Sequence, residues 1–346
     1  MSEHSPVYYG ADAVRRVLTW PLVNGAVESA LKAVVKDQGS PSPGSFAIQP
    51  KRIMTNCGDR SRILFTMPAF VGNYSLASEE TSSRSTLACK LVTSFRGNPQ
   101  KKPPLPSVQA HVLLFNSETG ELSAIMEGTD LTTWRTAAAS VLATKYLYFR
   151  RFGSQAEMDK EINVAIVGCG VQGQIHAISF CANFRVKQMT LYNRTESKAR
   201  DLAEKLKQEM DSKKQTTIVV CSSPGEACED ADVICIATYS REGLIHAKDL
   251  KKSSVHINSV GAGEVHFGEV AADVYHQAKV YVDCHANAEA ELKGLPAPIQ
   301  GEVGAVILNG SYPAEAGISI FQSMGMASED ACVAQAVQNA ILQQSS

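Results

Sequence analysis

Residues 162–173 read Ile-Asn-Val-Ala-Ile-Val-Gly-Cys-Gly-Val-Gln-Gly, and this stretch decides the fold. Residues 162–168 form an apolar run that is too short for a helix and ends at glycine, as a buried strand does. Gly168, Gly170 and Gly173 then have the spacing G-x-G-x-x-G at the start of a helical pattern. Glycines in this context allow a tight turn and a close approach of the backbone to a pyrophosphate, which the helix N-terminus faces. The stretch predicts a Rossmann dinucleotide-binding domain; a glycine-rich turn that binds nothing is the alternative.

Strand and helix continue to alternate after this turn. Helical periodicity covers Val171–Asn183 and Ser197–Met210, and the second of these has one apolar face. Strands that are apolar on both faces and separated by helices predict a doubly wound parallel sheet. The further strands that we expect are Gln188–Tyr192, Thr216–Cys221, Val233–Ala237, Val255–Val260 and Val280–Asp283.

The first third of the chain has a different pattern. Short apolar segments are separated by polar loops, and a Ser-Glu-Thr-Gly turn joins two of them, which predicts a hairpin. The expected strands are Arg62–Met67, Cys89–Ser94, Gln109–Asn116 and Glu121–Met126. Helices are expected over residues 135–147 and, after a loop rich in glycine and proline, over Ala327–Leu342. Glu329 and Asp330, at the start of that last helix, are expected to stabilise its N-terminus.

The end of the second predicted strand indicates which dinucleotide binds. An NAD-binding domain usually places Asp or Glu here, against the ribose hydroxyls. This chain has Asn193, Arg194 and Thr195 instead. A carboxylate would repel a 2′-phosphate, whereas an arginine binds it through charge-assisted hydrogen bonds. The residues therefore favour NADPH, and a solvated turn arginine is the alternative for Arg194.

Composition excludes several classes of protein. The formal net charge is −2, with 44% apolar and 20% charged residues, so nothing suggests a nucleic-acid partner. Nine cysteines lie without a CxxC spacing, and the histidines show no ligand spacing with Cys or Asp, so we expect free thiols and no metal. No apolar run has the length of a membrane helix. We expect a cytoplasmic protein without a membrane partner.

Motifs along most of the chain resemble those of the ornithine cyclodeaminase/mu-crystallin family. The similar stretches, in family order, are Gln49–Arg52, Met67–Ala69, Cys89–Thr93, Arg135–Ala138, the glycine turn, Asn193–Thr195, Ile257–Gly261 and Phe321–Asp330. The resemblance implies a Rossmann α/β domain with a smaller α+β domain that binds substrate and forms a homodimer. We place the smaller domain at residues 1–134 with 315–346, and the NADP-binding domain at 135–314.

The resemblance also implies roles for single residues. Arg52 and Arg135 would hold the substrate carboxylate, and Lys90 would bind substrate and act as the catalytic residue near the reacting carbon–nitrogen bond. Without the resemblance, these three would be read as ordinary surface or strand-edge charges. The implied cofactor contacts are Ser107, Arg135, Thr136, Gly168, Gly170, Val171, Gln172, Gly173, Asn193, Arg194, Thr195, Thr238 and Ser323.

One departure from the family pattern narrows the expected reaction. Cyclodeaminases have a catalytic aspartate where this chain has Gly263, and mu-crystallin-like members also lack it. Glu264 would point the opposite way on an extended segment. We therefore expect NADPH-dependent reduction of a cyclic ketimine carboxylate of the piperideine or pyrroline-2-carboxylate type. The alternatives are NADPH-dependent binding of iodothyronine hormones, and ornithine cyclodeaminase or amino-acid dehydrogenase activity.

Overall fold

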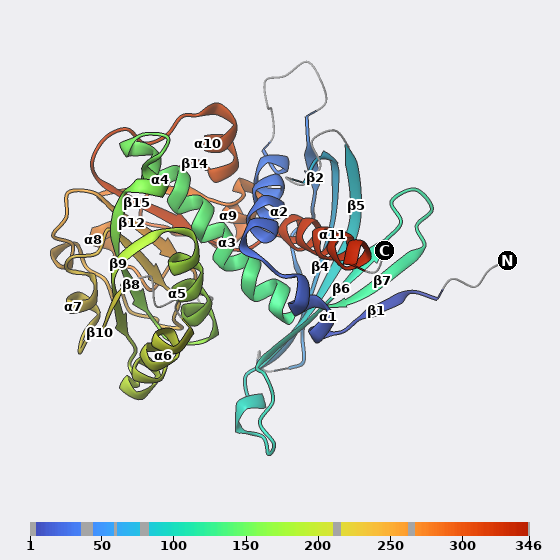
Figure 1. Ribbon diagram of the computed structural model, residues 1–346, viewed down its shortest axis with the longest axis horizontal. Helices are drawn as coiled ribbons and strands as arrows, with labels where there is room; N and C mark the ends of the chain where they lie inside the picture. Colours follow the sequence, from blue (N-terminus) through green and yellow to red (C-terminus); the bar gives the residue numbers. More distant parts are fainter. Residues whose placement is uncertain are drawn as a thin grey trace. The chain divides into compact units, whose positions relative to one another are not determined.

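The computed structural model describes residues 5–35, 44–58, 61–76, 83–209, 216–261 and 267–344. It divides the chain into two compact units, Met1–Arg135 with Gly325–Ser346, and Thr136–Met324. Each unit has its own sheet, and the helix α3 (Thr129–Leu147) contains residues of both (Figure 1).

The second unit is built on an eight-stranded sheet in which every pairing is parallel. Its order is β10-β9-β8-β11-β12-β15-β13-β14. The strands β8, β9 and β10 are added toward one edge of the sheet and the later strands toward the other, so the strand order reverses between β8 and β11. The predicted doubly wound fold class is confirmed. The strands are β8 (Glu161–Val167), β9 (Arg185–Tyr192), β10 (Thr217–Val220), β11 (Val233–Ile236), β12 (Val255–Ser259), β13 (Ala278–Val282), β14 (Ile299–Glu302) and β15 (Ile318–Gln322).

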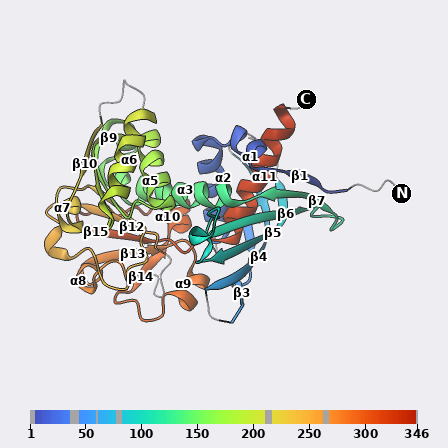
Figure 2. The same cartoon turned by 90° about the horizontal axis from the view of Figure 1, so that it is seen from below.

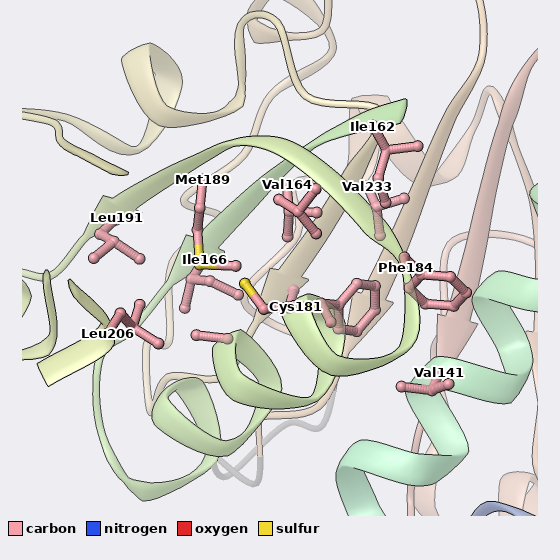
Figure 3. Packing of buried hydrophobic residues seen from close by; sticks show 14 of the residues in the cluster. Val141, Ile162, Val164, Ile166, Cys181, Phe184, Met189, Leu191, Leu206 and Val233 are labelled. Carbon is pink, nitrogen blue, oxygen red and sulfur yellow. The ribbon is translucent and has the colours of Figure 1, made fainter. Parts of the chain in front are cut away.

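Both faces of this sheet are covered, as its apolar strands require. On β8, Val164 and Ile166 belong to the cluster that contains α5 and α6 side chains, while Ala165 and Val167 belong to the cluster on the opposite face. Figure 3 shows the first cluster, where Phe184 and Met189 lie beside the β8 side chains. The helices of this unit, besides α3, are η2 (Phe149–Phe152), α4 (Ala156–Asp159), α5 (Val171–Asn183), α6 (Glu196–Glu209), α7 (Pro224–Cys228), η3 (Ala247–Asp249), α8 (Ala272–Tyr275), α9 (His285–Glu291) and α10 (Val303–Asn309).

The first unit is a seven-stranded sheet with helices on one face. The order is β1-β7-β6-β5-β4-β2, with β3 also paired to β4, and all pairings except β1 with β7 are antiparallel, which confirms the predicted hairpin of β6 and β7. The C-terminal helix α11 packs on β4 and β5 beside α2 (Figure 2). The elements are β1 (Val7–Tyr9), α1 (Ala11–Val17), α2 (Trp20–Ala33), β2 (Phe46–Ile48), β3 (Ile53–Asn56), β4 (Arg62–Tyr74), β5 (Arg84–Phe95), η1 (Asn98–Gln100), β6 (Val108–Phe115), β7 (Leu122–Glu127) and α11 (Ala327–Gln344).

The structure moves one predicted domain boundary. The sequence placed residues 315–324 with the smaller domain, in a loop rich in glycine and proline. They belong to the second unit, because β15 pairs with both β12 and β13 in its sheet. Five residues between glycines carry too little periodicity to indicate a buried central strand.

Candidate active site

Five charged side chains gather in the first unit, around the N-terminal turn of α11. Lys90 lies on β5 with its side chain buried, and its Nζ is 2.6 Å from Oδ2 of Asp330. Arg135 contacts both acids of the helix: Nη1 donates to Oε2 of Glu329 at 2.9 Å, and Nε lies 3.2 Å from Oδ1 of Asp330. Arg52 is the fifth member. The structure thus brings together the three residues that the resemblance assigned to substrate binding.

Gly325 connects the two arginines of this cluster. Nη2 of Arg52 donates to the Gly325 carbonyl oxygen at 3.1 Å. The φ angle of Gly325 is +76°, and a Cβ built on it would overlap the Arg135 guanidinium, with Cζ at 2.9 Å. Only glycine adopts this conformation without strain and leaves room for the guanidinium. Both arginine side chains therefore contact Gly325, in the turn before α11.

Glu329 and Asp330 have contacts that their expected role at the helix N-terminus did not indicate. Glu329 does accept a hydrogen bond from the backbone nitrogen of Met326, as a helix-capping residue does. Both acids are also fully buried and ion-paired, so capping alone does not describe them. A signal was present, because residues 331–334, which follow the acids in α11, are apolar on every face of the helix, and acids in a helix that is buried all round need buried partners.

Burial lowers the pKa of Lys90 from its ordinary value to about 8. The Asp330 carboxylate acts in the opposite direction and keeps the pKa from falling further, while the positive charges of Arg135 and Arg52 lower it. A pKa near neutrality lets an amine both hold and release a proton. The cluster therefore combines a titratable ammonium group with two permanent cations.

The cluster places three cations, Arg52, Lys90 and Arg135, beside the carboxylates of Glu329 and Asp330. Lys90 and Arg135 are buried, and Arg52 is partly exposed. Guanidinium groups bind carboxylates with two parallel hydrogen bonds. The arrangement is suited to a small carboxylate with a basic or imine nitrogen near Lys90.

The glycine turn of the second unit has the geometry that a dinucleotide needs. Gly168, after β8, has a φ of +98°, and a Cβ there would lie 2.5 Å from the Ala237 carbonyl oxygen. A Cβ on Gly173 would overlap the Gly168 carbonyl oxygen, so this glycine allows α5 to pack against the turn. Gly170 is the N-cap of α5, makes no side-chain cap, and a Cβ on it would meet nothing within 4 Å. The open N-terminus of α5 fits a pyrophosphate.

The residues after β9 lie beside this turn. Oδ1 of Asn193 accepts a hydrogen bond from the Cys169 backbone nitrogen at 3.0 Å, and its Nδ2 donates to the Thr195 carbonyl oxygen. Arg194 and Thr195 are exposed. Glu196, the nearest acid in the sequence, is hydrogen-bonded to Nε of Arg200 at 2.8 Å. Asn193 therefore links the segment after β9 to the glycine turn. Arg194, the next residue, is exposed.

The other predicted cofactor residues lie in both units. Within the second unit, Thr238 follows β11 with its Cγ2 close to Gly168, and Ser323 follows β15, where its nitrogen donates to the Ser259 carbonyl oxygen at 2.9 Å. Thr136 is buried on α3, and Val171 and Gln172 form the first turn of α5. Ser107 belongs to the first unit, where its carbonyl oxygen accepts a hydrogen bond from Phe95. Gly263 and Glu264 lie outside the described residues.

The described residues contain neither a metal site nor a membrane-spanning helix. In that part of the chain, no group of three or more His, Cys, Asp or Glu side chains could hold a metal ion. No helix among the described residues is both long and apolar enough to cross a membrane.

The parallel strand order and the glycine turn define a Rossmann unit of the dinucleotide-binding class. Residues 21–345 match the model of the ornithine cyclodeaminase/mu-crystallin family. The chain belongs to this family, as its motifs predicted.

Known proteins resemble the chain over nearly its whole length. Ketimine reductase mu-crystallin of Mus musculus is 34% identical over 342 residues, which cover 97% of each chain. The structure of Thermococcus litoralis Delta(1)-pyrroline-2-carboxylate reductase in complex with NADH and L-proline is similar with a TM-score of 0.79, 26% identity and 98% coverage of each chain. An archaeal alanine dehydrogenase dimer with bound NAD has a TM-score of 0.80 and 25% identity, covering 99% of this chain and 97% of the other.

Proposed function

We propose that this protein is an NADPH-dependent oxidoreductase that reduces cyclic ketimine carboxylates to cyclic amino acids. The observation that carries the proposal is the cluster in which two guanidinium groups, Arg52 and Arg135, meet the buried Lys90 at the turn before α11. Relatives named as ketimine and pyrroline-2-carboxylate reductases support an NAD(P)H-dependent enzyme that acts on imines.

Arg52 and Arg135 bind the substrate carboxylate in this proposal. Both guanidinium groups are held in place before substrate arrives, Arg52 by the Gly325 carbonyl oxygen and Arg135 by Glu329 and Asp330. A fixed guanidinium loses little freedom when it binds a carboxylate, so the reacting carbon is oriented at low entropic cost.

Lys90 controls the proton on the imine nitrogen. A protonated imine accepts a hydride more readily than a neutral one, so an acid close to the nitrogen favours reduction. With a pKa of about 8, the Lys90 ammonium is mostly protonated at neutral pH and can still give up its proton. Asp330, at 2.6 Å, holds the Nζ in place and keeps the ammonium charged.

The second unit holds the dinucleotide. Reduced nicotinamide supplies the hydride when the cofactor is bound. The N-terminus of α5 and the turn at Gly168 and Gly170 receive the pyrophosphate, because backbone N–H groups point out of an uncapped helix end. Thr238 forms the adjoining wall of this turn.

NADPH is proposed over NADH from the residues after β9. Arg194 is exposed in the turn after β9, the position from which an arginine can bind a 2′-phosphate, and the charge of Glu196 is engaged by Arg200. The T. litoralis relative was solved with NADH, so the proposal of NADPH rests on the residues of this chain alone.

A homodimer is proposed from the sheet of the first unit. The face opposite α11 carries apolar side chains in register across neighbouring strands, such as the row Pro68, Cys89, Leu113 and Ile125. A sheet face exposed to water normally carries polar residues, so this face is suited to a second copy of the chain. The archaeal alanine dehydrogenase of similar structure is a dimer.

All nine cysteines are free, which supports a cytoplasmic location.

The test is to mix purified protein with piperideine-2-carboxylate or pyrroline-2-carboxylate and follow the loss of NADPH absorbance, with NADH in parallel. The proposal expects rapid oxidation of NADPH and a lower rate with NADH at equal concentration. Tight NADPH binding without turnover, together with binding of an iodothyronine, would replace the proposal by the hormone-binding alternative. Formation of proline from ornithine and NAD would indicate a cyclodeaminase.

A further inference from the structure

Glu269 is a buried carboxylate that the proposed reaction does not use. It lies in the second unit, three residues beyond the end of the segment 262–266 that the structure does not describe, and is 1% exposed. A carboxylate is rarely buried unless its oxygens are hydrogen-bonded. The donors that bind the Glu269 carboxylate therefore indicate its role in the fold.

Glu269 accepts three hydrogen bonds from two different loops. Oε2 accepts from the backbone nitrogen of Thr238 at 2.5 Å and from its Oγ1 at 2.6 Å. Oε1 accepts from the backbone nitrogen of Gly261 at 2.7 Å. Thr238 is in the loop after β11 and Gly261 is in the loop after β12, so one side chain ties together the carboxyl ends of two neighbouring strands.

One of these loops, which contains Thr238, is next to the glycine turn. A Cβ on Gly168 would lie 2.8 Å from Cγ2 of Thr238, so Thr238 directly contacts the turn. In an open parallel sheet, ligands bind outside the carboxyl ends of the strands where the strand order reverses, which here is between β8 and β11. The position of Thr238, and therefore the shape of that crevice, depends on the contacts that Glu269 makes.

We infer that Glu269 is a positioning residue for the dinucleotide: it holds the Thr238 loop and the Gly261 loop at the spacing in which the crevice accepts NADPH. The inference rests on the proposed dinucleotide site. A carboxylate is suited to this role because it accepts from all three donors at once, whereas an amide in its place would direct its own N–H groups at one of them. Burial raises the pKa of Glu269 to about 7, while the hydrogen bonds from Thr238 and Gly261 act in the opposite direction and favour the carboxylate form.

Asp232 provides a matched control in the same unit. It is also a buried carboxylate with three donors: the Tyr148 hydroxyl at 2.8 Å, the Asn163 nitrogen at 2.8 Å and the Lys252 Nζ at 2.6 Å. It precedes β11 and contacts the start of β8, so it lies at the amino ends of the strands, opposite the glycine turn. Loss of its charge tests the effect of disturbing a buried carboxylate without touching the crevice.

The experiment compares wild type, Glu269→Gln and Asp232→Asn by direct titration with NADPH fluorescence and by thermal melting. We expect Glu269→Gln to raise the Kd for NADPH by roughly ten-fold or more, and Asp232→Asn by less than about two-fold, although both lower the melting temperature. In steady state, Glu269→Gln should raise KM for NADPH and leave kcat at saturating NADPH within about three-fold of wild type.

Equal Kd values for wild type and Glu269→Gln would overturn the inference while leaving the proposed function intact. A similar rise in Kd for both variants would also overturn it, because the effect would then be one of stability. Failure of the wild type to bind NADPH would contradict the proposed function itself. If Glu269→Gln does not fold, Thr238→Val removes one of the three contacts at nearly constant volume and should change the Kd in the same direction.

Discussion

Replacement of Asp330 by asparagine should move the pH range in which the enzyme works. The change removes the negative charge that lies 2.6 Å from the Lys90 Nζ and leaves a side chain of the same shape. Arg135 and Arg52, which lower the pKa of Lys90, remain. The pKa of Lys90, about 8 in the wild type, should therefore fall, and the protonated form needed to act as an acid should disappear at lower pH.

The size of the shift follows from the contact. A charge pair at this distance interacts by roughly 6 kcal/mol at an effective dielectric constant of about 20, and relaxation and water entry reduce this severalfold. We expect the pKa to fall by about two units, each worth about 1.4 kcal/mol. At about pH 7.5 the protonated fraction of Lys90 would then drop roughly 25-fold, and kcat/KM with it.

The assay is the pH profile of kcat/KM for the ketimine carboxylate, which reports the free enzyme. Ionisation of the substrate is common to both profiles, so only their difference matters. Glu329→Gln is the control, because it changes the other acid on Arg135 and should weaken carboxylate binding without moving the alkaline limb. An alkaline limb of Asp330→Asn at the wild-type position, with unchanged kcat/KM, would refute the role given to Lys90.

Three further predictions concern other parts of the molecule. Arg194→Ala should raise KM for NADPH by about ten-fold or more and leave KM for NADH nearly unchanged, and equal changes for both cofactors in steady-state kinetics would contradict a 2′-phosphate contact. Gly325→Ala, at a φ of +76° and against the Arg135 guanidinium, should lower the melting temperature and raise KM for the ketimine carboxylate; a calorimetric scan and a substrate titration identical to wild type would contradict the geometry of that turn. Leu113→Glu, on the apolar face of the first unit, should convert a dimer to a folded monomer in sedimentation velocity, and a dimer of unchanged stability would exclude that face as the interface.

The second unit was predictable because its signals are local in the sequence. Gly168, Gly170 and Gly173 lie within six residues, and the strand before them and the helix after them follow from adjacent periodicity. The exception is β15, a short segment whose place between β12 and β13 is set by pairing with strands far away in the chain. Pairing of this kind leaves no local pattern.

The charged cluster was only partly predictable for the same reason. Arg52, Lys90 and Arg135 were assigned through the family resemblance, and nothing in their own neighbourhoods distinguishes them from surface charges. Their contacts with Glu329 and Asp330 join residues from distant parts of the chain. Helix position alone favoured a capping role for the acids; only the packing of α11 on β5 shows that they are buried against cations.

The most direct test of the account follows the hydride itself. NADPH that carries deuterium on the transferring position of nicotinamide C4 is incubated with the protein and pyrroline-2-carboxylate, and the product is analysed by mass spectrometry and NMR. The account predicts proline that contains one deuterium on its α carbon, formed by wild type and strongly reduced in Lys90→Met. Bound NADPH with no labelled proline, or equal labelling by Lys90→Met, would contradict it.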